Sequence, residues 1–471
     1  MIFSSTLFIF LFLPFVLVVH FLLAKKFRNF FILLVSLFFY AWGENILVLL
    51  MMGSICVNYI FGNIISEYQN KGKEKLSQIA LIAGVIINLS VLGYYKYIHF
   101  FLESLSHLGL SLNVDVSNVT LPIGISFFTF QSISYLIDVS RKTVSGQKSL
   151  IKLGMYISLF PQLIAGPIVR YADIAKEIQN RKISAPLFKV GISRFIIGFS
   201  KKILIANNVG LIADKVFEIV PGELSTPLSW IGIVCYSLQI YYDFSGYSDM
   251  AIGLGKMFGF NFKENFEHPY ISSSIREFWR RWHISLSSWF KDYLYIPLGG
   301  NRKGNFRNFL NLLIVFFLTG LWHGASWNFV VWGLFHGAFI ILERFNIIKL
   351  PSKLNFLSRI YTLLVVIVAW VFFRSDNLEY AVSFIYKMFS FTSGSNNHPY
   401  LFFNTYTLIA MLVGIAFSMP LRKYIELIFN SLIKNKVVFN FIRYSILLFL
   451  FLFSISEVAQ TTYNPFIYFR F

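Results

Sequence analysis

The stretch that decides the fold class is residues 308–344, "NFLNLLIVFFLTGLWHGASWNFVVWGLFHGAFIILER". Two apolar runs flank a short break, Gly324, Ala325 and Ser326, and the titratable His323 stands directly before this break. Each run is shorter than the ~20 residues that a full membrane crossing needs. We therefore predict a re-entrant helical hairpin with its turn, 323–328, inside the membrane. Non-helical backbone is tolerated there only where protein or a water-filled cavity surrounds it.

The rest of the chain has the composition of a membrane protein. Of its 471 residues, 56% are hydrophobic and 13% charged, and the mean hydropathy is +0.64. Apolar segments of membrane-spanning character recur near 30–50, 51–66, 78–101, 121–138, 150–168, 188–206, 226–246, 358–373, 403–420 and 444–457. The sequence therefore predicts an all-α polytopic protein with about eleven or twelve membrane helices, forming a single membrane-embedded domain over 1–471.

The charge pattern excludes some partners and sets the topology. The 41 Lys and Arg exceed the 22 Asp and Glu, but the cations cluster in short gaps between apolar runs. Topogenic loops and contact with anionic membrane lipids explain this excess better than nucleic acid does. Two lone cysteines, Cys56 and Cys235, exclude a disulfide scaffold and a cysteine-based zinc site, and we expect no metal and no permanently bound cofactor.

Basic residues at both ends of the chain predict where its termini lie. Lys25, Lys26 and Arg28 follow the first apolar run, and Lys434, Lys436 and Arg443 precede the last one. Because such residues stay in the cytoplasm, both termini are expected outside it, and the tail 458–471 should emerge there.

A basic stripe is predicted on a helix over 275–291. At about 100° per residue, Arg276, Arg280, His283, Ser287 and Lys291 share one face, and apolar residues occupy the other. One interpretation is an interfacial helix lying on anionic lipid. The other is a cytoplasmic mouth that binds the phosphates of an anionic cofactor, to which Arg302 and Lys303 of "GGNRKG" add two cations.

Two further residues are candidates for chemistry. A histidine in a membrane helix is more often structural, but His323 lies beside small residues at a helix break and has the pKa range of a general base. His336, in "WGLFHGAF", is assigned to packing. Tyr468 is either an interfacial anchor or a reactive phenol that a nearby base must activate.

Six motifs carry a family resemblance: "LPIGISFFTFQSISYLIDV", "FPQLIAGPIVRY", "YYDFSGYSDMAIGLGKMFGF", "FWRRWHISLSSWFKDYLYIPLGG", "LTGLWHGASWNFVVWG" and "NPFIYFRF". In order and content they resemble the membrane-bound O-acyltransferases, in particular the bacterial alginate and peptidoglycan O-acetyltransferase branch. The motif core covers about 120–345. The resemblance implies helices around a central tunnel, in a multi-pass protein of the bacterial cytoplasmic membrane.

The resemblance also implies an activity and its residues. His323 matches the family's catalytic histidine, His283 its second polar position, and Tyr468 a tail tyrosine that receives the acyl group transiently. Acetyl-CoA is the implied cytoplasmic donor, bound near Arg276, Arg280, Lys291, Arg302 and Lys303. The implied acceptor is an extracytoplasmic polysaccharide, reached through an esterase-like partner transferase.

Two other functions remain open from the sequence. One is D-alanyl transfer to teichoic acid, with the acyl group delivered by a carrier protein. The other is a proton-coupled polysaccharide exporter, in which buried histidines relay protons. The absence of an internal repeat counts against an exporter.

Overall fold

The structure is a computed structural model that describes residues 1–471 except 113, 165, 349–354, 393–397, 462 and 466–471. The described residues contain helices and no strand, which confirms the all-α prediction. They divide into two compact units, the first formed by 1–195 and 250–263 and the second by 196–249 and 264–471. Helices α10, Ala185–Ser200, and α12, Thr226–Met257, contribute residues to both units.

The first unit contains α1 Leu13–Leu22, α2 Arg28–Glu44, α3 Val48–Asn70, α4 Glu74–Leu92, α5 Ile98–His107, α6 Ile125–Ser140, α7 Leu150–Ser158, α8 Phe160–Leu163 and α9 Tyr171–Gln179. Helices α3, α4 and α6 pack against one another. The side-chain amides of Asn58 and Asn88 hydrogen bond reciprocally between α3 and α4, at 3.1 and 2.9 Å. Such polar pairs hold helices together where lipid removes the hydrophobic driving force.

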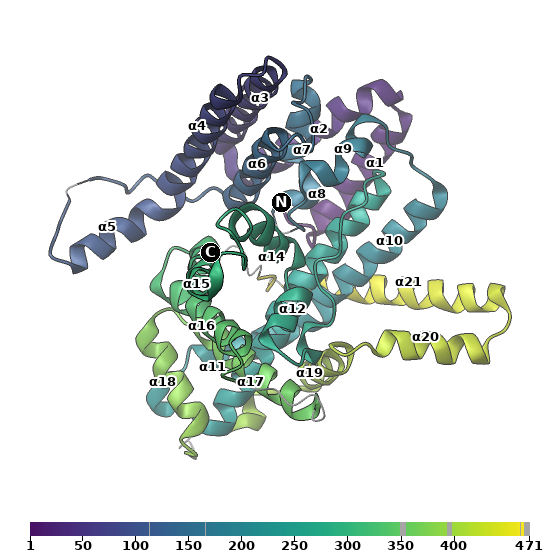
Figure 1. Ribbon diagram of the computed structural model, residues 1–471. Coiled ribbons are helices and arrows are strands. Elements are labelled where there is room, and N and C mark those ends of the chain that lie inside the picture. Colours follow the sequence, from purple (N-terminus) through teal and green to yellow (C-terminus); the bar gives the residue numbers. More distant parts are fainter. Residues whose placement is uncertain (113, 165, 349–354, 393–397, 462, 466–471) are drawn as a thin grey trace. The chain divides into compact units, whose positions relative to one another are not determined.

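The second unit contains α11 Asn207–Phe217, α13 Ile275–Arg281, α14 Ile284–Phe290, α15 Gly304–His323, α16 Trp327–Arg344, α17 Asn355–Arg374, α18 Leu378–Phe389, α19 Thr405–Phe417, α20 Leu421–Leu432 and α21 Lys436–Gln460. Helices α15 and α16 lie side by side as a hairpin (Figure 1), and α13 and α17 pack on α16. Three fully buried tryptophans, Trp282, Trp332 and Trp370, form the core between these helices.

Glycines permit the close approach of the two hairpin helices. A Cβ atom on Gly320 would overlap the carbonyl oxygen of Phe329, and one on Gly333 would overlap that of Phe316. Small residues at such crossings let helix backbones touch. The predicted helix break directly after His323 is therefore confirmed, with Gly324–Ser326 connecting the two helices.

The two arms of the hairpin are longer than predicted. Helix α15 has 20 residues and α16 has 18, because both continue through polar residues at their ends, which were expected to be loop. Helix α15 is itself long and apolar enough to cross a membrane.

Six helical stretches of the described chain meet this criterion of length and hydropathy: Lys25–Asn70, Glu74–His107, Ala185–Phe217, Gly304–His323, Asn355–Arg374 and Lys436–Gln460. Two shorter apolar helices are Phe8–Leu22 and Thr405–Phe417. The number is smaller than the eleven or twelve expected. Helices α6 and α7, with 16 and 9 residues, are too short, and α12 carries Gln239, Asp243 and Asp249 on a long buried helix.

Candidate functional site

His323 is the last residue of α15 and lies at the turn of the hairpin. Its side chain is buried, and its ring meets those of Trp322, Trp332 and Phe373 edge-on, with centroids 5.0, 4.9 and 5.2 Å away. Gly324 follows in an extended conformation, and a Cβ there would overlap the ring of Phe329. The aromatic rings and the glycine together hold the imidazole at a helix end.

His283 lies beside His323, which the sequence alone did not predict. The two ring centroids are 6.3 Å apart, and the ring of Trp322 lies 5.8 Å from that of His283. His283 is fully buried, and burial lowers its pKa from the usual 6.5 to about 3. The imidazole of His283 is therefore neutral near pH 7.

The predicted continuous helix over 275–291 is wrong at His283. This residue has a left-handed backbone, with φ +43° and ψ 54°, and it separates α13 from α14. The backbone amide of Ile284 donates to the carbonyl oxygen of Asn265 at 3.0 Å, a bond that a continuous helix would not make. The break removes His283 from the basic stripe and turns it toward His323.

The cations of the basic stripe converge without His283. Arg276, Arg280 and Lys291 line a pocket of about 220 Å³ together with Arg344. The remaining lining is mainly apolar and comes from α13 to α16: Trp279, Leu286, Ser287, Phe290, Tyr295, Leu312, Val315, Phe316, Thr319 and Ile340. Thr319 lies one helical turn before His323 on α15, so one wall of the pocket comes from the helix that ends at the buried histidine.

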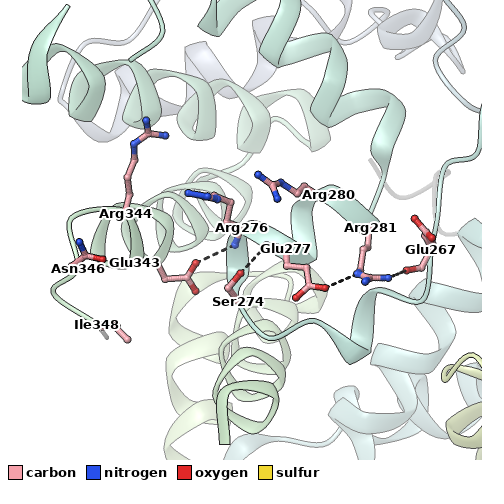
Figure 2. Close-up of a pocket in the computed structure, with 10 residues that line it drawn as sticks. All are labelled: Glu267, Ser274, Arg276, Glu277, Arg280, Arg281, Glu343, Arg344, Asn346 and Ile348. Atoms are coloured by element: carbon pink, nitrogen blue, oxygen red, sulfur yellow. Dashed lines mark hydrogen bonds and ion pairs between the residues drawn. The ribbon is translucent and has the colours of Figure 1, made fainter. Parts of the chain in front are cut away.

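A second, more polar pocket of about 670 Å³ shares Arg276, Arg280 and Arg344 with the first. Figure 2 shows that the side chains of these three arginines have no ion-pair partner among the residues drawn, and no described carboxylate lies within 4 Å of their nitrogens. Glu343 instead accepts the backbone N–H groups of Ile275 and Arg276, at 2.7 and 3.2 Å. The carboxylate thereby caps α13 and leaves the guanidinium groups available to an anion.

Arg281 differs from the other arginines of this pocket. It pairs with Glu277 at 2.9 Å and donates to the carbonyl oxygen of Glu267 at 3.1 Å. Arg302 and Lys303, the other predicted cofactor contacts, are exposed in the turn before α15 and line neither pocket.

Tyr468 falls outside the described residues, but residues 463–465 are placed. The hydroxyl of Tyr463 donates to Asp214 at 2.5 Å, and Lys202 donates to the carbonyl oxygen of Pro465. Lys202 is almost fully buried and pairs with Asp243 at 2.8 Å. Residues 463–465 thus pack on protein side chains.

Comparison with known proteins identifies the family of this chain. The profile of the membrane-bound O-acyltransferase family matches residues 36–378. The chain belongs to this family. The match includes both histidines, both pockets and the α15–α16 hairpin, and it identifies the chain as a multi-pass membrane protein.

Individual members of the membrane-bound O-acyltransferase family show the same relationship. The chain is 39% identical to a "Probable alginate O-acetylase" of Pseudomonas putida, over the whole of both proteins. It is 36% identical to a "Peptidoglycan O-acetyltransferase" of Helicobacter pylori, over 82% of this chain and 80% of the relative. Similarity to a "Teichoic acid D-alanyltransferase" of Bacillus subtilis is 31%, over 47% of this chain and 59% of the relative.

Several residues of this site carried no usable sequence signal. Asn265 lies in the irregular stretch "NFKENFEHP", and Arg344 stands at the end of an apolar run with nothing to mark it as a ligand. Lys202 lies in an ordinary apolar segment of predicted helix. Their importance comes from contacts between distant parts of the chain, which periodicity does not report.

Proposed function

We propose that this chain moves an acetyl group from cytoplasmic acetyl-CoA across the bacterial cytoplasmic membrane to a hydroxyl of an extracytoplasmic polysaccharide. The observation that carries the proposal is a single pocket that combines four cations with apolar walls and includes Thr319, one turn from His323. Coenzyme A has a matching composition, with phosphates at one end and a thin, largely apolar pantetheine arm ending in the thioester.

Guanidinium groups bind phosphates through paired, charge-assisted hydrogen bonds. Arg276, Arg280, Arg344 and Lys291 take this role in the proposal. Arg302 and Lys303 serve as outer phosphate contacts, because Tyr295, which ends the π-helical turn Lys291–Tyr295 a few residues before them, lines the pocket. The donor is a substrate, and no permanently bound cofactor is part of the reaction.

His323 acts as the general base. It takes the proton from the attacking hydroxyl while the hydroxyl oxygen bonds to the carbonyl carbon of the thioester. The carbon–sulfur bond then breaks, and the proton passes from His323 to the thiolate of coenzyme A. A positioned base typically contributes ~10²–10⁴-fold. His283, beside His323, orients the reacting groups.

Tyr468 is the proposed first acceptor. The contacts of Tyr463 with Asp214 and of Pro465 with Lys202 hold the chain only three residues before it. An acetylated Tyr468 then donates to an esterase-like partner transferase on the outer side, where both termini are expected. The acceptor class follows the two acetylating relatives, which match this chain over most of its length.

The test is incubation of the purified protein, reconstituted in lipid vesicles, with acetyl-CoA carrying a radiolabelled acetyl group. We expect label on the protein, lost in Tyr468→Phe, and label on alginate or peptidoglycan fragments when the partner is added. Absence of label on both protein and glycan would reject acetyl transfer.

D-alanyl transfer to teichoic acid is the second candidate. It has the support of the Bacillus subtilis relative, but that similarity covers only 47% of this chain. In the same vesicles, a D-alanyl thioester on a carrier protein would label the chain in place of acetyl-CoA if this candidate were correct.

A further inference from the structure

Asn265 makes a dense set of hydrogen bonds around His283. It is buried in the stretch between α12 and α13. Its side-chain oxygen accepts the backbone N–H of Ser285 at 3.1 Å and the hydroxyl of Ser285 at 2.8 Å, and it lies 3.3 Å from Nδ1 of His283. Its side-chain nitrogen donates to the hydroxyl of Ser248 at 3.1 Å.

These contacts fix which end of the amide faces His283. A backbone N–H can only donate, so the side-chain oxygen of Asn265 must be the atom that faces Ser285. The same oxygen faces Nδ1 of His283, and an oxygen acceptor requires a hydrogen on that nitrogen. The Ser285 hydroxyl, 3.4 Å from Nδ1, is directed instead to Asn265 at the shorter distance of 2.8 Å.

The other ring nitrogen of His283 has a different environment. Its Nε2 atom is buried, and it has no hydrogen-bond partner among the described residues. A neutral imidazole with its hydrogen on Nδ1 leaves a lone pair on Nε2. Buried polar atoms are nearly always paired in folded proteins, so an unpaired acceptor beside His323 points to a group that arrives with the substrate.

We propose that Asn265 is a positioning residue that holds His283 in the Nδ1–H tautomer, so that Nε2 accepts a hydrogen bond from an N–H or O–H of the substrate other than the hydrogen that His323 removes. This assignment rests on the proposed function only for the identity of the group that donates to Nε2. It makes His283 a hydrogen-bond acceptor that orients the substrate, and it excludes His283 as a donor to the developing oxyanion.

The backbone of His283 supports the assignment. A non-glycine residue in the left-handed region persists only when its surroundings determine it strongly. Asn265 does so twice, through its carbonyl oxygen to Ile284 and its side chain to Ser285. The same residue therefore sets both the position and the protonation pattern of the imidazole.

The groups that face His283 are few. His323 on α15 is the titratable side chain whose ring meets it. The other rings packed against it, Phe244 of α12, Phe266 and Trp322, carry no charge. A negative charge at position 265 should thus change the pKa of His283 without an opposing effect from these uncharged rings.

The first experiment needs no acyl donor. The protein, which contains eight histidines, is labelled with ¹⁵N-histidine, and the tautomer of His283 is read from its two ring ¹⁵N shifts after assignment with His283→Gln. We expect a protonated Nδ1 and an unprotonated Nε2 in the wild type, and the opposite or a mixture in Asn265→Ala. A protonated Nε2 in the wild type would overturn the inference, whatever the outcome of the acetyl-transfer assay.

The second experiment follows the protonation of His283 with pH through the same ring ¹⁵N shifts. Asn265→Asp keeps the oxygen acceptor but places a carboxylate against the imidazole, which raises the pKa of His283 because an opposite charge favours the protonated form. The midpoint pH of His283 protonation should move up by at least about one unit. Ser248→Ala, which removes a neighbour of Asn265 but no acceptor for Nδ1, should leave the midpoint in place. Equal midpoints in Asn265→Asp and wild type would leave Asn265 only a structural role.

Discussion

Replacement of Arg280 by glutamine should raise the KM for acetyl-CoA and leave kcat unchanged. Its guanidinium lines both pockets and forms no ion pair with a described carboxylate. A phosphate would therefore be its partner, and the interaction would be equally strong in the bound and transition states. Loss of such uniform binding appears in KM alone.

The size of the effect follows from the exposure of Arg280. A hydrogen bond to a charged group is worth about 1.5–3 kcal/mol when protected from water. Arg280 is exposed, so solvent screening reduces this to ~1 kcal/mol. Since 1.4 kcal/mol corresponds to tenfold, we expect about a fivefold rise in KM, and roughly 25-fold in Arg276→Gln/Arg280→Gln if the two effects add.

Arg281→Gln is the matched control. Arg281 lines the same larger pocket, but its guanidinium is already occupied by Glu277 and Glu267. Its replacement should change KM for acetyl-CoA less than twofold, because no phosphate contact would be lost.

Initial rates should be measured with acetyl-CoA and with S-acetylpantetheine, which has the thioester but no phosphate. Arg280→Gln should affect only the first donor, and added salt should reduce the difference between variant and wild type. An equal rise in KM for both donors, or an effect of Arg281→Gln as large as that of Arg280→Gln, would refute phosphate binding at this pocket.

Three further predictions follow from the core of the second unit. His323→Gln should lower acetyl transfer by about 10²–10⁴-fold while the melting temperature in detergent stays close to that of the wild type; full activity would reject the base. Gly333→Leu should destabilise the hairpin by more than the ~1–3 kcal/mol of ordinary overpacking, because the leucine side chain would overlap the carbonyl oxygen of Phe316. The control Gly53→Ala should not lower the melting temperature, because the space around a Cβ atom at Gly53 is open. The pKa of His283 is lowered to about 3 in the fold. Its contribution to the free energy of unfolding is therefore present above pH 6.5 and falls as the pH decreases toward 3. The variant His283→Gln should make unfolding less sensitive to acid over that range.

The sequence predicted the helical class and the helix break after His323, because both depend on local composition. Runs of apolar residues predict membrane helices wherever they occur, and the short stretch Gly324–Ser326 interrupts such a run locally. The convergence of Arg276, Arg280 and Lys291 was also predictable, since these residues share a helix face at about 100° per residue. In the structure they line one pocket, even though the helix is interrupted between them.

Periodicity failed where a distant residue controls the backbone. It placed His283 on the basic stripe because it assumes a continuous helix. Asn265, 18 residues earlier in the chain, instead bonds to Ile284 and Ser285 and forces the left-handed turn. The predicted length of the hairpin arms was wrong for a related reason, because polar residues at the ends of α15 and α16 remain helical when the two helices pack.

Residue types and their spacing were enough to identify a bundle of membrane helices and a group of cations within 276–303, because hydropathy and charge are properties of single residues and their neighbours. Only the tertiary structure decided that a second histidine meets the first at 6.3 Å and that an asparagine governs its hydrogen. Such contacts join residues far apart in the chain, and their geometry depends on how the helices pack, which no local pattern of residue types contains.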